Sequence, residues 1–177
     1  MAISFNKRLS AFSLIELMIM FIIIGILASI AVPAYHNYVV RASVAKALLL
    51  AESMKNEVLQ YFQDNNALPC CGSTTNILLG QNGYSGPLTV YYNGLTSDMY
   101  QISYTGYTNN MAHIDLWFTQ TFSKKNFNIN SYIRFTLQAQ VDSNGQLTWI
   151  CGPYYDPTYS VPAAYLPQTC QGVTTNS

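Results

Sequence analysis

An apolar stretch occupies residues 12–34, and its only charged side chain is Glu16. Folded as an α-helix, this stretch of about 23 residues would be about 35 Å long, enough to cross the hydrocarbon core of a bilayer. Lys7 and Arg8 precede the stretch, and no acidic residue does. By the positive-inside rule, this end starts in the cytoplasm and the rest of the chain is exported. The stretch therefore predicts a membrane-length helix near the N-terminus of the chain.

Glu16 is the unusual feature of this helix, because a carboxylate near the bilayer interior costs a few kcal/mol unless it is neutralised or paired. A secretory signal peptide cut near residues 28–34 is one alternative, but the stretch is longer than the usual h-region. A signal peptide also gains nothing from a carboxylate. A simple membrane anchor explains the span and not Glu16, which is therefore a candidate functional residue.

The overall composition excludes several classes of protein. Only 9% of residues are charged, 50% are hydrophobic, and eight basic side chains balance eight acidic ones. A neutral chain lacks the strong basic field of a typical nucleic-acid binder. So few charges are also unlike the surface of an ordinary cytosolic enzyme. The composition favours a membrane-anchored protein or one packed against copies of itself.

The helical pattern continues beyond the apolar stretch. Apolar residues recur at steps of three and four, with polar residues between them: Val44, Leu48, Ala51, Met54, Val58 and Phe62. Such a stripe needs a partner surface. Residues 12–64 are thus expected to form one helix of about 80 Å. Pro33 lies inside it, lacks a backbone donor and should kink or loosen it.

Residues 11–18, which read Ala-Phe-Ser-Leu-Ile-Glu-Leu-Met after a short Lys/Arg leader, resemble the N-terminal signature of type IV pilins. The resemblance is specific over about residues 6–64. It implies that a prepilin peptidase cuts between Ala11 and Phe12 and methylates the new terminus of Phe12. Gly25 and Pro33 match family positions near a segment that loosens in assembled filaments. Ala11 departs from the family, which usually has Gly before the cut.

The resemblance places Glu16 fifth in the mature chain, close to a terminal amine at Phe12. When helices bundle in a filament, the carboxylate of one subunit can meet the terminal amine of its neighbour. Opposite charges buried together are tolerable, whereas either one buried alone is costly. Glu16 is therefore expected to set the axial register of subunits.

Beyond residue 65 the chain is rich in Tyr, Asn, Gln, Ser and Thr. Strand-like runs follow a loop region at residues 88–92, 99–107, 112–121, 131–141 and 146–151. Asp142 to Gly145 reads as a hairpin turn, and it lacks the later ligands of a calcium loop. We expect an α+β fold, with a four-stranded, mostly antiparallel sheet on the amphipathic half of the long helix and a disulfide-tethered C-terminal loop.

The cysteines are Cys70, Cys71, Cys151 and Cys170, and export makes disulfides the default. Four cysteines allow three pairings, and the residues alone leave the pairing open. Many pilins have a disulfide-bounded loop near the C-terminus, and this resemblance puts Cys151–Cys170 ahead. Cys70 and Cys71 would then form a vicinal bridge or remain free. No spacing predicts a metal site.

Other polar groups are weaker candidates. His113 and Asp115 could share one face of a strand, but the sequence places no nucleophile near them. We therefore expect both to be polar residues on the surface. Lys124 and Lys125 read as a solvated basic pair. With Arg134 they could form a local basic stripe that touches DNA.

The sequence thus predicts a structural subunit of a type IV pilus, with no enzymatic activity and no cofactor. Residues 1–11 would be a cleaved leader, residues 12–39 a membrane and assembly helix, and residues 40–177 an exported globular domain. Its partners would be copies of itself, prepilin peptidase, the inner membrane and the pilus assembly machinery of a Gram-negative bacterium. The alternatives are a type II secretion pseudopilin and a DNA-binding minor pilin.

Overall fold

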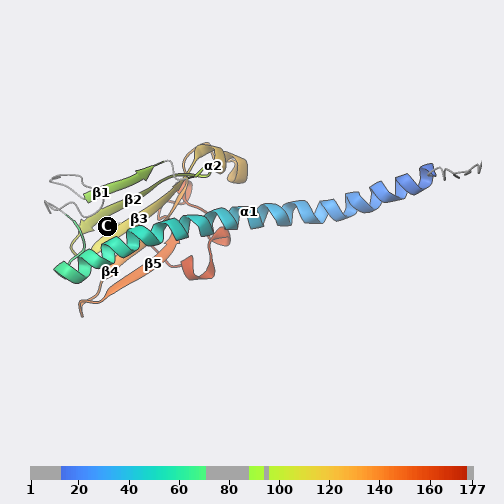
Figure 1. Cartoon of the computed structure of the whole chain (residues 1–177). Coiled ribbons are helices and arrows are strands. Elements are labelled where there is room, and N and C mark those ends of the chain that lie inside the picture. The colour runs from blue at the N-terminus through green and yellow to red at the C-terminus, as the bar shows by residue number, and fades with distance from the viewer. Residues whose placement is uncertain (1–12, 71–87, 94–95, 175–177) are drawn as a thin grey trace, which may run out of the picture. The chain divides into compact units, whose positions relative to one another are not determined.

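Figure 1 shows the computed structural model, which describes residues 13–70, 88–93 and 96–174. The chain divides into two compact units, Met1–Tyr38 and Val39–Ser177, and the second is called the head below. In chain order the described elements are α1 (Leu14–Asn65), β1 (Leu88–Asn93), β2 (Met99–Thr108), β3 (Met111–Phe118), α2 (Gln120–Phe127), β4 (Arg134–Val141), β5 (Leu147–Pro153) and 3-10 helices at Pro157–Tyr159, Ala163–Tyr165 and Gln168–Cys170.

Helix α1 confirms the long helix expected over residues 12–64. Its helical assignment continues without a break through Gly25 and Pro33. In the head, α1 buries one stripe at the spacing of three and four that places side chains on one face. The stripe consists of Val40, Val44, Ala47, Ala51, Met54 and Val58. Leu48 and Phe62 from the predicted stripe are partly buried beside it.

The sheet is an antiparallel meander in which each strand pairs with the next along the chain, in the order β1-β2-β3-β4-β5. Strands β2 to β5 form the four-stranded antiparallel sheet that was expected, and β1 adds one more strand beside β2. Between β4 and β5, Gly145 has a φ of 76°, and the Asp142 carboxylate accepts the backbone N–H groups of Asn144 and Gln146 at 2.8 Å. This is the predicted hairpin turn.

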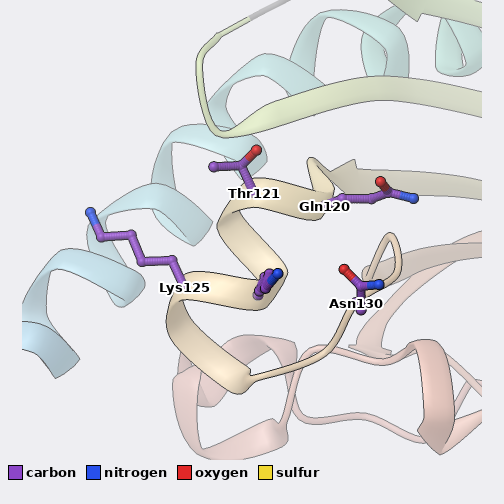
Figure 2. Close-up of a pocket in the computed structure, with 5 residues that line it drawn as sticks. Gln120, Thr121, Lys125 and Asn130 are labelled. Carbon is purple, nitrogen blue, oxygen red and sulfur yellow. The ribbon is translucent and has the colours of Figure 1, made fainter.

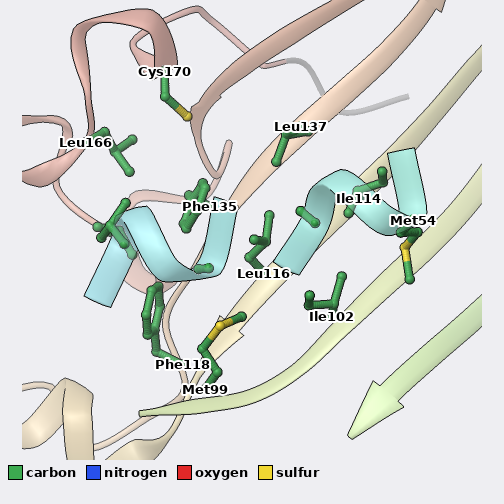
Figure 3. Close-up of a cluster of buried hydrophobic side chains, with 14 of the residues drawn as sticks. Met54, Met99, Ile102, Ile114, Leu116, Phe118, Phe135, Leu137, Leu166 and Cys170 are labelled. Carbon is green, nitrogen blue, oxygen red and sulfur yellow. The ribbon is translucent and has the colours of Figure 1, made fainter. Parts of the chain in front are cut away.

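The core lies between α1 and one face of the sheet (Figures 1 and 3). Along β3 the buried apolar residues alternate, as the period of a strand requires, with Ala112, Ile114, Leu116 and Phe118 in the core cluster. Figure 3 shows Met54 of α1 and Ile114 of β3 in this buried cluster. Full burial of a Leu, Ile, Phe or Met side chain stabilises a fold by about 1.5–3 kcal/mol. The predicted two-layer α+β architecture is confirmed.

Helix α2 corrects one sequence prediction. The strand predicted over residues 112–121 ends at Phe118, because Thr119 begins a helix instead. The Thr119 hydroxyl accepts the Phe122 N–H at 3.2 Å, which is an N-cap. The rings of Phe118 and Phe122 stack with centroids 4.6 Å apart, and Asn128 ends the helix with a φ of 57°. The local caps therefore override the apolar run that suggested a longer strand.

The C-terminal segment is joined to the sheet by a disulfide between Cys151 and Cys170, whose Cα atoms lie 4.3 Å apart. The pairing implied by the family resemblance is thus confirmed, and the two that join either cysteine to Cys70 or Cys71 are wrong. Beyond the bridge, the Gly172 N–H donates to the Cys151 carbonyl at 2.8 Å. Cys70 is buried with its Sγ 3.1 Å from Asn109 Oδ1, and Cys71 lies outside the described residues.

Candidate functional site

The first half of α1 exposes an apolar surface on every side. Its most apolar window of 18 residues has a mean hydropathy of 2.7, and none of that window is buried. Leu14 is 79% exposed and Ile30 is 70% exposed. By length and composition this helix can cross a membrane. Such a continuous apolar surface marks a membrane or protein interface, because water contact is costly.

Glu16 lies in the first turn of α1, where a negative side chain interacts favourably with the positive end of the helix dipole. The N–H groups of Glu16 and Leu17 donate to the Ser13 carbonyl at 3.1 and 3.3 Å. The Glu16 side chain is exposed and makes no ion pair with a described residue. Glu16 is therefore available to a partner from outside the chain.

The other predicted assembly residues lie on the same half-helix. A Cβ on Gly25 would meet nothing within 4 Å, so this position is open to close approach by another helix. Pro33 is exposed inside the helix. Ala11 and Phe12, the predicted cleavage and methylation residues, lie outside the described residues.

Two hydrogen bonds join the first residues of α1 that belong to the head to distant segments. Arg41 Nη2 donates to the Ala164 carbonyl at 2.9 Å, which lies in the disulfide-bounded loop. The Ser43 hydroxyl donates to Asp98 Oδ2 at 2.9 Å, and the Asp98 carbonyl accepts the N–H of Thr119, the N-cap of α2. These contacts gather the loop and α2 at the end of the head where α1 enters.

A polar cluster lies on the sheet face opposite the core. Asp115 of β3 is opposite Thr136 of β4, whose hydroxyl donates to Asp115 Oδ1 at 2.6 Å. Arg134 Nη1 lies 3.8 Å from the other carboxylate oxygen. The Arg134 guanidinium also lies between the rings of Trp117 and Tyr154, 3.8 and 3.5 Å from their centroids. Burial raises the pKa of Asp115, although Thr136 and Arg134 act in the opposite direction.

His113 and Asp115 share this face as predicted, but both are buried, so the expected surface position was wrong. His113 is 1% exposed, and neither ring nitrogen has a hydrogen-bond partner among the described residues. The Tyr107 ring packs edge-on against the imidazole, with centroids 4.8 Å apart. Burial, and then the charge of Arg134, lower the pKa of His113 to about 4. The imidazole is therefore a neutral packing group at neutral pH, a role that the strand alternation alone does not reveal.

The predicted basic stripe does not form. Lys124 and Lys125 line one surface hollow with Gln120, Thr121 and Asn130 (Figure 2). Arg134 does not lie free beside them, because Asp115 and two aromatic rings enclose it. The DNA interpretation thus loses the cation that would have extended the lysine pair.

Comparison with known proteins identifies the family. The family described as "Pilin (bacterial filament)" matches residues 40–171. The "Type IV major pilin protein PilE" of Neisseria gonorrhoeae is 47% identical over 64 residues, which is 36% of this chain and 38% of that protein. The "Type IV major fimbrial protein FimA" of Dichelobacter nodosus is 42% identical over 72 residues, 41% of this chain and 43% of that protein.

A "Fimbrial protein" of Neisseria meningitidis serogroup A is also 42% identical over 72 residues, or 41% of this chain and 42% of that protein. The chain thus spans about two fifths of the length of the curated relatives it matches. The family match itself covers most of the head, including the helix stripe, the sheet and the disulfide. On that match, the chain belongs to the pilin family.

Proposed function

We propose that the chain is the structural subunit of a type IV pilus, which polymerises with copies of itself into a surface filament. The observation that carries this proposal is the exposed, membrane-length half of α1, with Glu16 in its first turn, joined to a folded pilin head. The apolar half needs a partner that the head does not supply. A lipid bilayer meets this need before assembly, and the helices of neighbouring subunits meet it in the filament.

Processing follows from this assignment. A prepilin peptidase cuts between Ala11 and Phe12 and methylates Phe12, and the terminal amine of Phe12 pairs with Glu16 of a neighbouring subunit. Gly25 and Pro33 lie where the half-helix loosens during assembly. Residues 1–11 are then the leader, residues 12–39 the assembly helix and residues 40–177 the exported domain. The boundary between the two compact units, after Tyr38, supports this division.

The wider setting is also part of the proposal. The precursor sits in the inner membrane of a Gram-negative bacterium, with the assembly machinery as its partner, and the filament serves adhesion, twitching motility or DNA uptake. The names of the curated relatives, type IV major pilin and fimbrial protein, favour this assignment over a secretion pseudopilin. The enclosure of Arg134 argues against a DNA-binding minor pilin.

Intact-mass and N-terminal peptide analysis of the subunit, purified from surface filaments, tests the proposal. The expected chain begins at Phe12 with one added methyl group. A mature terminus near Ala34 would instead establish a cleaved signal peptide and overturn the proposal. Expression without the peptidase is the control, since it should retain residues 1–11.

A further inference from the structure

One end of the head has an excess of exposed cations. The hydrogen bonds made by Arg41 and Ser43 gather the disulfide-bounded loop and the start of α2 at this end. The last residues of α2 contact the same loop, because the Phe127 ring packs edge-on against Tyr165 with centroids 5.2 Å apart. The exposed cations here, called the basic end below, are Arg41, Lys46, Lys124 and Lys125. None of the four forms an ion pair with a described residue.

The opposite end of the head is acidic. The Asn109 carbonyl, between β2 and β3, accepts the N–H of Leu68, which follows α1, at 2.8 Å. The neighbouring Asn110 carbonyl accepts the N–H of Val141, the last residue of β4, at 2.9 Å. The last turn of α1 and the β4–β5 hairpin therefore meet at this end. The exposed carboxylates here, called the acidic end below, are Asp64 and Asp142.

The basic and acidic ends are far apart within the head. Figure 1 shows α2 and the last turn of α1 at opposite ends of the sheet. The helical rise from Ser43 to Asp64 is about 31 Å, and Lys46 lies only about one turn beyond Ser43. Strand β3, which runs from the acidic end to the basic end, is about 23 Å long. Both lengths exceed the Debye length of about 8 Å at physiological salt, so the two ends do not neutralise one another.

The other charged side chains of the head leave this separation in place. They are the ion pairs Lys55–Glu52 and Arg134–Asp115 and the carboxylates Glu57, Asp98 and Asp156. Asp98 is bonded to Ser43, and Asp156 belongs to the loop that Arg41 contacts, so cations still outnumber carboxylates four to two at the basic end. Glu57 lies about two turns before Asp64, towards the acidic end. Residues 71–87, 94–95 and 175–177 contain no charged side chain.

This charge distribution limits how two heads can meet through their ends. Two basic ends, or two acidic ends, would bring like charges together, which is unfavourable. A basic end against an acidic end brings opposite charges together. Such a contact uses two different surfaces, so each copy keeps an end free for a further copy. The separation of charge therefore favours an open row of heads over a closed pair.

We propose that the basic end of one head binds the acidic end of the head of a second copy. This contact deepens the proposed function and rests on the polymerisation proposed there. A second copy is the partner because the acidic end of the same head supplies the complementary charge. The charges are exposed, so the contact weakens as salt rises and mainly selects which surfaces meet.

Filament assembly by full-length charge variants tests the proposal, with each variant expressed as the sole copy. Lys124→Glu/Lys125→Glu reverses the basic end, and Gln63→Lys/Asp64→Lys reverses the acidic end at exposed positions of α1. Each change brings like charges together, so the mass of filaments sheared from the cells should fall about tenfold. The variant that combines both changes exchanges the two polarities and should restore most of the filament mass.

A matched control separates the contact from net charge. Lys124→Gln/Lys125→Gln and Lys55→Glu change the net charge equally, but only the first acts at the basic end, so only the first should reduce filament mass. Urea unfolding of each purified subunit verifies that its head is folded.

Normal filament mass in both reversal variants would overturn the proposal. So would a loss that the combined variant does not restore, because the basic end would then serve another anionic partner, such as DNA or lipid phosphate. A wild-type chain that forms no filaments would instead count against the proposed function.

Discussion

The two halves of α1 have the same secondary structure and opposite relations to the rest of the chain. In the head, the stripe from Val40 to Val58 is buried in the core, as the fully buried Val44 and Ala51 show. In the first half, apolar residues surround the helix and stay exposed within the chain. The comparison shows that helical periodicity indicates where a partner comes from: a one-sided pattern is satisfied internally, and an all-round pattern needs lipid or other subunits.

Replacing Glu16 by Ala should produce the largest effect on this contrast. The change removes the carboxylate proposed to pair with a neighbour's terminal amine, so surface filaments should fall at least tenfold while the head keeps its stability. Electron microscopy of piliation and urea unfolding of the purified chain measure the two quantities. Glu52→Ala is the matched control, because its surface pair with Lys55 contributes little. Normal piliation of Glu16→Ala would remove the pairing argument.

Truncation of the Met54 side chain tests the half of α1 that packs in the head. Met54 is 1% exposed in the core between α1 and the sheet, so Met54→Ala should cost about 2–5 kcal/mol of unfolding free energy. Ile26→Ala, at a 60% exposed position of the first half, should leave the unfolding of the head nearly unchanged. Chemical denaturation followed by Trp fluorescence compares the variants. Equal losses in both would show that the halves are not energetically distinct.

Acidification should destabilise the head through His113. Because the folded pKa of about 4 is below the ordinary 6.5, the unfolded chain binds the extra proton first. The stabilisation is therefore complete above about pH 6.5 and declines by up to about 3 kcal/mol as the pH falls toward 4. The raised pKa of Asp115 acts in the opposite direction and offsets part of the loss at the acid end.

Unfolding of the wild type and of His113→Gln at pH 7.5 and 4.5 measures this dependence. The variant should have a smaller pH difference than the wild type. His36→Gln, a change in the first compact unit, should retain the wild-type difference. If the stability of His113→Gln differs between the two pH values as much as that of the wild type, another group causes the pH dependence.

The smallest expected effect concerns the cap of α2. Thr119→Ala removes the acceptor for the Phe122 N–H and should cost about 1 kcal/mol, whereas Thr119→Ser should keep most of the stability. Exchange of the α2 amides measures the change. Such a result would show that α2 is stabilised by contacts within the head, like the second half of α1.

Much of this contrast was predictable from sequence. The apolar stretch, the stripe from Val44 onward, the hairpin at Asp142 and the α+β class each follow from a local pattern. Helix α2 was missed because its first residues, Gln120 and Thr121, were included in the strand-like run that ends at residue 121, and the Thr119 cap was not considered. The buried cluster was missed for a different reason: alternation assigns His113 to a sheet face, but only the fold shows that Tyr107 covers it. The cysteine pairing needed the resemblance, because spacing left three choices.

The bond from Gly172 to Cys151 affects how subunits can associate. The last strand of an open sheet offers unpaired backbone groups to any passing strand, which invites uncontrolled aggregation. Here the segment after the disulfide occupies part of β5, and a side chain at Gly152 would collide with the Gly172 carbonyl, so only glycine permits this close approach. Strand addition at this part of β5 is thus blocked by the chain's own C-terminal segment.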